Sequence, residues 1–313
     1  MLPRRWGLVA LAAIGGLALW AQASTVQADG AIGPGDNLWA AWNANPLPSL
    51  ALCLVAYLYV NGLSRWPQPS HPVNRWQKIS FFAGLFTIFL ALQSPIDALA
   101  QHQLSIHQVQ HLILRMIGPL LVLAGAPLTP ILRGLPRWAL QGVIKSVVRN
   151  SFARRFYDFL TNPVVTTVLF LGILYVWQAP FLHNLAIRNE LVHAAMHGNM
   201  LFSGLLFWWL VVDPKPHRSR LHYGLRVLYL GLIVIPNTLL GAGITFNPNL
   251  IYDAYYDHPQ PLPMSPLVDQ QVGALLLWMV GDMMSILIAG FVMMLWYRQE
   301  QARGQDEWDP AVH

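Results

Sequence analysis

Long apolar segments alternate with short polar connections along most of this chain. After an apolar run at residues 8–20, seven further apolar segments occur at 47–63, 79–93, 104–125, 163–179, 191–212, 225–245 and 267–296. A helix needs about 20 apolar residues to cross a bilayer, so the short second segment and the long last one imply tilt or extension past the membrane. The pattern predicts an all-α integral membrane protein with seven transmembrane helices.

The first residues have the features of a targeting signal. Arg4 and Arg5 precede the apolar run, and small residues follow it around 21–23 and 26–28. A basic start, a short apolar core and an A-x-A pattern are typical of a secretory signal. We therefore expect a signal peptide at 1–28, with an uncleaved anchor helix as the alternative, and a seven-helix domain at 29–313.

Composition supports a membrane protein and limits the available chemistry. The chain is 55% hydrophobic and 11% charged, whereas soluble domains carry about 25% charged residues. The single cysteine, Cys53, excludes a disulfide framework and a CxxC metal motif. Any metal chemistry must therefore use His, Met and carboxylate side chains.

The basic residues predict an orientation. They gather between the first and second segments, the third and fourth, the fifth and sixth, and after the seventh: Arg65, Arg75, Lys78; Arg133, Arg137, Lys145, Arg149, Arg154, Arg155; Lys215, Arg218, Arg220, Arg226; Arg298, Arg303. The other loops hold only Arg188. Because basic loops stay in the cytoplasm, the mature protein is predicted to be N-out and C-in.

The basic residues also explain the net charge of +5 without a nucleic-acid role. At about 135–159 they alternate with apolar and aromatic side chains such as Trp138 and Phe156. This segment is predicted to be an amphipathic helix on the inner membrane surface.

Two histidine pairs are the most informative polar feature. His107 and His111 start the third segment, and His193 and His197 start the fifth. The i,i+4 spacing places both rings of a pair on one helix face, and both segments enter from the predicted outer side. A single membrane His often only forms hydrogen bonds between helices. Two pairs at matched depth instead predict a metal site.

Imidazole suits copper and zinc, and thioether sulfur favours Cu(I). Met196 lies three residues after His193, and Met200 three residues after His197, so copper is the favoured metal and zinc is possible. His102 and Asp269 are further candidates on the outer side, with Asp269 as a partner of a metal-bound His. All four are possible accessory residues of the metal site, although core packing is the simpler explanation for each Met.

Two charged residues lie deep in apolar segments. Arg115 is four residues past His111, and Asp282 lies in the middle of the last segment. Buried membrane charges normally pair with each other or line a polar cavity. We therefore predict a buried charge pair of these two residues.

Three sequence blocks, in order, resemble the CtaG-type assembly factors of caa3-type cytochrome c oxidase. They are His107-Gln-Val-Gln-His111-Leu with Gly125-Ala-Pro127, then His193-Ala-Ala-Met-His197 running into Gly204-Leu-Leu-Phe-Trp-Trp209, and Asp269-Gln270 with Gly273 and Trp278. The resemblance covers most of the seven-segment region. It implies a multi-span protein that is needed for maturation of a haem–copper oxidase, plausibly by handling copper.

The expected function is therefore that of a non-enzymatic assembly factor, a metallochaperone in the inner or plasma membrane. It would bind copper at the outer, periplasmic face and assist metallation of an oxidase subunit. The expected partners are cytochrome c oxidase subunits, a periplasmic copper chaperone and the lipid bilayer. Two alternatives stay open: a membrane redox enzyme with haem or non-haem metal, and a metal transporter.

Overall fold

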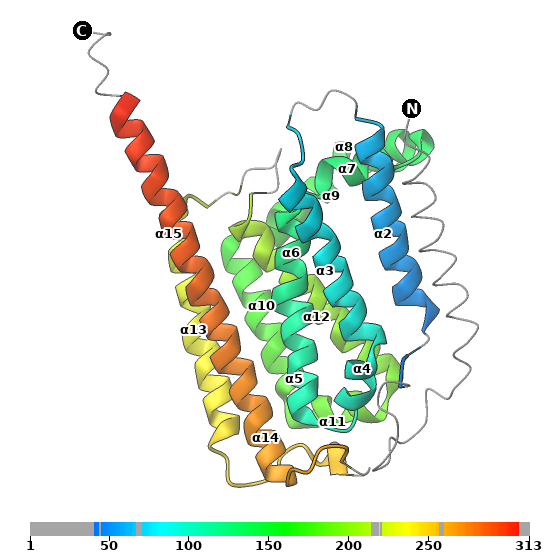
Figure 1. The fold of residues 1–313 in the computed structure, drawn as a ribbon, viewed down its shortest axis with the longest axis vertical. Helices are drawn as coiled ribbons and strands as arrows, with labels where there is room; N and C mark the ends of the chain where they lie inside the picture. The colour runs from blue at the N-terminus through cyan, green and yellow to red at the C-terminus, as the bar shows by residue number, and fades with distance from the viewer. Residues whose placement is uncertain are drawn as a thin grey trace.

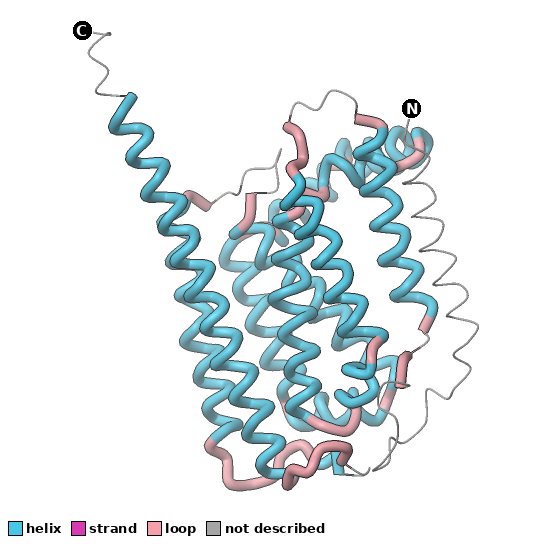
Figure 2. The backbone as a smooth tube through the Cα atoms, viewed as in Figure 1, coloured by secondary structure: helices cyan, strands magenta, loops and turns pink. Residues whose placement is uncertain are grey.

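The computed structural model describes residues 41–43, 45–66, 71–213, 219, 221–256 and 260–306. The predicted signal segment at 1–28 lies outside these residues. Every regular element in the described ranges is a helix and none is a strand. Figure 2 shows long helices that are joined by short loops, so the predicted all-α class is confirmed.

The helices fall into two groups. The long, continuous ones are α2 (Pro46–Ser64), α3 (Arg75–Gln93), α10 (Pro163–Gln178), α12 (Glu190–Val211) and α13 (Tyr223–Thr245). Two more long helices contain a π-helical turn: α5 (Leu104–Leu112) with η2 (Ile113–Ile117) and α6 (Gly118–Ala124), and α14 (Pro266–Leu275) with η5 (Leu276–Val280) and α15 (Gly281–Asp306). The short ones are α4 (Pro95–Ala100), α7 (Leu128–Gly134), η3 (Ala139–Ile144), α8 (Lys145–Arg149), α9 (Ser151–Leu160), α11 (Pro180–Arg188) and η4 (Asp253–Tyr256).

Asparagine starts many of these helices. The side chain accepts a hydrogen bond from the first turn at Asn45, Asn74, Asn150, Asn162 and Asn189. Such caps satisfy backbone N–H groups that have no partner within the helix. Proline follows the cap of α2 and α10, where its missing N–H costs nothing. The starts of these helices are therefore determined by residues that are adjacent in the sequence.

Length and composition identify the membrane spans. Five helical segments suffice to cross a bilayer: Pro46–Ser64, Leu104–Ala124, Glu190–Val211, Tyr223–Thr245 and Pro266–Arg303. Helices α9 and α10, which meet at a 65° bend, supply a sixth if they count as one span. The chain is thus a multi-pass membrane protein.

The predicted count of seven spans is not reached. Helix α3 has 19 residues, but Arg75, Gln77 and Lys78 in its first turn dilute its apolar character. Helix α10 alone has 16 residues, or about 24 Å, which is shorter than the apolar core of a bilayer. Five to six spans are supported, and seven stays a prediction.

The helix α5–η2–α6 lies inside the bundle. It packs against α3, α4, α12 and α14. Gly204 of α12 contacts the backbone of η2 so closely that an added Cβ would overlap the carbonyl oxygen of Arg115. Gly273 of α14 similarly faces Leu104, where an added Cβ would lie 3.0 Å from the Leu104 Cγ. Small residues at these crossings let the helices approach closely.

The short helices divide between the two ends of the bundle. Figure 1 shows α4, α11 and α14 at one end, and α7, α8 and α9 at the opposite end with the end of α15. Helix α9 carries Phe152, Phe156 and Phe159 as exposed side chains on one face. The single amphipathic helix expected at about 135–159 is divided into η3, α8 and α9, with Asn150 capping the start of α9. Its placement on the inner membrane surface remains a prediction.

Candidate metal centre

Each histidine pair lies on one helix face, as predicted. The ring centroids of His107 and His111 on α5 are 4.3 Å apart, and those of His193 and His197 on α12 are 4.2 Å apart. All four side chains are buried, with His193 the most exposed at 8%. The i,i+4 spacing therefore produces two compact pairs inside the protein.

The fold brings the two pairs together. The centroid of His107 lies 5.2 Å from that of His193 and 5.7 Å from that of His197, and His111 lies 5.7 Å from His197. Helix α12 packs against η2 and α6, and the histidine rings meet nearer the start of each helix. We refer to His107, His111, His193 and His197 as the histidine cluster.

Three members of the cluster lie close enough together that they could hold one metal ion. One ring nitrogen from each of His107, His111 and His197 lies within 4.8 Å of the others. Nitrogens that bind one copper or zinc ion at about 2.0 Å are roughly 3.4 Å apart. Modest ring rotations would close this difference. His193 stands outside the trio and nearer the surface.

Unpartnered nitrogen atoms indicate what the cluster requires. Within the histidine cluster, five buried ring nitrogens have no hydrogen-bond partner: Nε2 of His107, both nitrogens of His111, Nε2 of His193 and Nε2 of His197. Each buried polar atom without a partner costs about 1–3 kcal/mol. Native proteins seldom tolerate several of these in one place. A bound metal ion would satisfy a set of imidazole lone pairs, so these residues fit copper or zinc.

Two residues beside the cluster were not predicted to belong to it. The ring of His183 on α11 lies 5.2 Å from His107, and the hydroxyl of Tyr255 in η4 lies 2.7 Å from both His107 Nδ1 and His183 Nε2. His183 Nδ1 lies 3.0 Å from the carbonyl oxygen of Trp177. The sequence signals were the position of His183 on the expected outer side and a tyrosine-rich loop at 252–256 on the same side. Its contact with α11 depends on the tertiary fold.

Asp269 and Gln270 form hydrogen bonds at the end of the protein that carries the histidine cluster. The Asp269 carboxylate accepts hydrogen bonds from the backbone N–H groups of Leu104 at 2.8 Å and Ser105 at 3.1 Å, and from the Ser105 hydroxyl. It thereby caps α5, whose own cap residue supplies no side-chain bond. Gln270 Oε1 accepts from the Ile251 N–H at 2.9 Å and its Nε2 donates to the Asn249 carbonyl at 3.0 Å. The two residues fix α5 and the loop before η4.

We expect Asp269→Asn to lower the midpoint of thermal unfolding in detergent. The side-chain NH₂ of the new asparagine would face a backbone N–H group that now donates to the carboxylate. Charge-assisted hydrogen bonds contribute about 1.5–3 kcal/mol, and this change removes them at the start of α5. Glu300→Gln is the matched control, since Glu300 pairs with Arg303 at 3.3 Å with both side chains largely exposed. Such a surface pair contributes at most about 1 kcal/mol. Equal midpoints for the two variants would contradict the capping role.

The other accessory candidates have surroundings of their own. Met196 and Met200 are fully buried in a core that includes Leu174 and Trp177. His102 precedes α5 and makes no ring contact with the four histidines, all of which lie in the described part of the chain. Both Asp269 oxygens are engaged at the cap of α5. A metal role for these residues stays an expectation.

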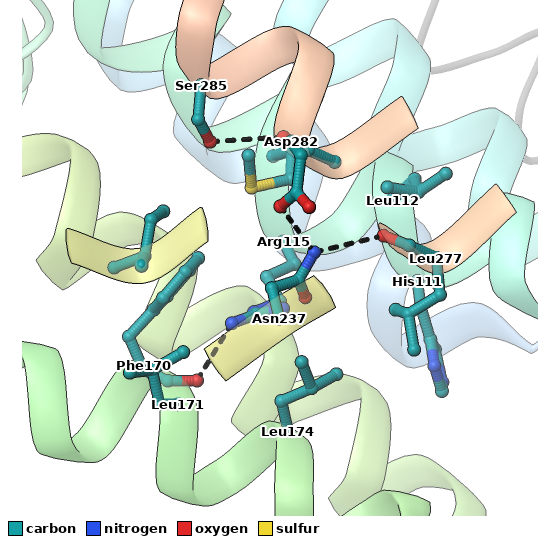
Figure 3. Close-up of a pocket in the computed structure, with 13 residues that line it drawn as sticks. His111, Leu112, Arg115, Phe170, Leu171, Leu174, Asn237, Leu277, Asp282 and Ser285 are labelled. Atoms are coloured by element: carbon teal, nitrogen blue, oxygen red, sulfur yellow. Dashed lines mark hydrogen bonds between the residues drawn. The ribbon is translucent and has the colours of Figure 1, made fainter. Parts of the chain in front are cut away.

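The two deep charges face one cavity without forming a direct ion pair. Arg115 donates to the Phe170 carbonyl oxygen at 3.0 Å and stacks 3.6 Å above the Phe170 ring. The Asp282 carboxylate accepts from Asn237 at 2.8 Å and Thr238 at 2.6 Å. Figure 3 shows Arg115, Asp282 and His111 around this cavity, which has a volume of about 10 Å³. That is room for about one water.

Arg115 lies within a π-helical turn that begins two residues after His111. Residues Ile113–Ile117 form this turn, η2. Arg115 and His111 line the same cavity. In place of the predicted direct pair, Arg115 and Asp282 are each held by neutral partners.

The fold and the site together define a multi-pass, all-helical membrane protein with a buried histidine cluster between two of its helices. Residues 55–299 match the model of the cytochrome c oxidase caa3 assembly factor family, Caa3_CtaG. The chain therefore belongs to this family of assembly factors.

Curated relatives align with most of this chain. An uncharacterized protein of Mycobacterium leprae (strain TN) is 24% identical over 277 residues, and one of Mycobacterium tuberculosis (strain CDC 1551 / Oshkosh) is 25% identical over 272 residues. These alignments cover 84% and 83% of this chain but 40% of each relative. The chain thus spans less than half the length of these relatives. No solved structure matches it.

Proposed function

We propose that this assembly factor binds copper as cargo through the histidine cluster and passes it to a cytochrome c oxidase subunit. The observation that carries the proposal is the set of five buried ring nitrogens without partners, contributed by two different helices. His107, His111 and His197 would hold the ion. His193, the most exposed member, would be the first to meet an ion that enters or leaves.

The donor set favours a late first-row metal. Neutral imidazoles suit copper and zinc, and copper binds such sites more tightly in the Irving–Williams order. Copper is also a cargo that an oxidase assembly factor has reason to handle. The role needs no nucleophile or general base, so we propose a metallochaperone rather than an enzyme.

Membrane orientation sets the side of delivery. The basic loops predict that the starts of α5 and α12 face the periplasmic side of the inner or plasma membrane. The ion would then come from a periplasmic copper chaperone and pass to an oxidase subunit that is reached from that side. The basic ends of the helices would remain in the cytoplasm.

The packing around the cluster disfavours the haem alternative. The cavity beside His111 measures about 10 Å³, far less than a porphyrin requires. Arg115 on the inner side of the same cavity also disfavours a cation path towards the cytoplasm. Both observations favour a site that loads and unloads from one side.

The test is the metal content and visible spectrum of the detergent-purified protein after loading with copper or zinc. We expect stoichiometric copper, and cells without this protein should contain oxidase that lacks copper until the wild-type gene is restored. Failure to bind either metal after loading would refute the proposal. A Soret band in the purified protein would instead show that it binds haem.

A further inference from the structure

Tyr255 and His183 form a hydrogen-bond chain that ends on a proposed copper ligand. The chain runs from the Trp177 carbonyl oxygen to His183 Nδ1 at 3.0 Å, from His183 Nε2 to the Tyr255 hydroxyl at 2.7 Å, and from there to His107 Nδ1 at 2.7 Å. The side chains of His107, His183 and Tyr255 are all completely buried. Water therefore cannot substitute for any link.

The direction of every hydrogen bond follows from the first one. A carbonyl oxygen only accepts, so His183 Nδ1 carries a proton and donates it to Trp177. The His183 ring is completely buried and its two hydrogen-bond partners, a carbonyl and a hydroxyl, are both uncharged, so the ring is neutral and Nε2 is an acceptor. Tyr255 must then donate its hydroxyl proton to His183 Nε2.

The last link determines the tautomer of His107. Because the Tyr255 hydroxyl proton points to His183, the Tyr255 oxygen accepts from His107, whose Nδ1 must carry the proton. The lone pair of neutral His107 then lies on Nε2, which is the buried nitrogen without a partner. The chain of partners thus selects the nitrogen that is available to a metal.

We propose that Tyr255, supported by His183, is a positioning residue that holds His107 in the Nδ1–H tautomer with Nε2 ready to bind the metal. This inference rests on the proposed function. Such outer partners fix ring orientation and raise the basicity of a metal-bound His. Tyr255 itself does not contact the ion.

The loop that carries Tyr255 is held rigidly enough for this role. Tyr252 donates to the Gln178 carbonyl oxygen at 2.8 Å, and Asn184 of α11 hydrogen-bonds Asp253 and accepts from the Ala254 N–H at 3.4 Å. Gln270 fixes Ile251 from α14, as described above. Helices α10, α11 and α14 therefore all position η4 beside His107.

The experiment compares Tyr255→Phe with Tyr256→Phe. Both variants remove one hydroxyl from η4, but the Tyr256 hydroxyl bonds the Pro266 carbonyl oxygen at 2.9 Å, whereas that of Tyr255 bonds His107. We expect Tyr255→Phe to weaken copper binding about 10–100-fold and to alter the EPR spectrum of the Cu(II)-loaded protein. Tyr256→Phe should leave both properties at wild-type values, even if its thermal midpoint falls. Wild-type affinity and EPR spectrum in Tyr255→Phe would overturn the proposal.

A second measurement tests the tautomer without any metal. ¹⁵N NMR of metal-free protein labelled at histidine, with His107 assigned from the spectrum of His107→Asn, should show the proton on Nδ1. In Tyr255→Phe the Nε2–H form should become populated. A wild-type His107 protonated at Nε2 would refute the chain. If wild-type protein binds no copper, the proposed function fails, and this measurement still decides the role of Tyr255.

Discussion

Replacing His111 with Ala is expected to lower the copper affinity of the purified protein by more than about 100-fold. Loss of an outer partner of a metal ligand already costs about 10–100-fold, so loss of a ligand should cost more. His111 is 1% exposed and both of its ring nitrogens lack partners, so no other role in the described structure accounts for its burial. Competition with a copper chelator of known affinity measures the change.

Neighbouring histidines provide graded comparisons for this variant. His107→Ala and His197→Ala should resemble His111→Ala, because the three share one site. His193→Ala should have a smaller effect on affinity, because His193 lies outside the trio. His71→Ala is the matched control, since His71 is exposed and far from α5 in sequence. If His111→Ala retained wild-type affinity, the trio would not be the metal site.

Gly204→Ala should destabilise the protein and abolish copper binding together. An added Cβ would overlap the Arg115 carbonyl oxygen of η2, and neither backbone can move without separating α12 from η2. Overpacking of this kind costs about 1–3 kcal/mol, and separation would pull the two histidine pairs apart. Thermal unfolding in detergent and copper affinity are the two measurements.

Gly198→Ala is the control on the same helix. Gly198 directly follows His197, yet an added Cβ would meet no atom within 4 Å. Alanine favours a helix over glycine by up to about 1 kcal/mol, so this variant should be as stable as wild type or more so. Normal copper binding by Gly204→Ala would show that the close crossing does not set the geometry of the cluster.

Several features of this protein could be read from local sequence because they depend on neighbours in the chain. Apolar segments predicted the helices, and asparagine with proline marks where helices such as α2 and α10 begin. The pairing of His107 with His111, and of His193 with His197, follows from i,i+4 spacing alone. The number of membrane spans does not follow from local sequence in the same way. Helix α3 is long enough to cross a bilayer, but the polar residues at its start make it less apolar than the other spans.

Other features depend on contacts between distant segments. Asp269 was predicted as a candidate metal partner, which stays a prediction, and only the fold reveals that its carboxylate caps α5 from 164 and 165 residues away. Arg115 and Asp282 were predicted to pair, but neutral partners bind each of them. Met196 and Met200 share the helix of the second pair and pack in the apolar core. Residue type and spacing do not report which partner is closest in space.

The sequence by itself determined an all-helical membrane protein with two histidine pairs at matched positions, because helix period and apolar length are local properties. Only the tertiary structure decided that these pairs meet, that three of the four rings converge, and that His183 and Tyr255 lie beside them. Those contacts join α5, α11, α12 and η4, and they form only where glycines such as Gly204 let helices approach. The physical reason is that a metal site is built from directions of side chains, which the packed fold sets.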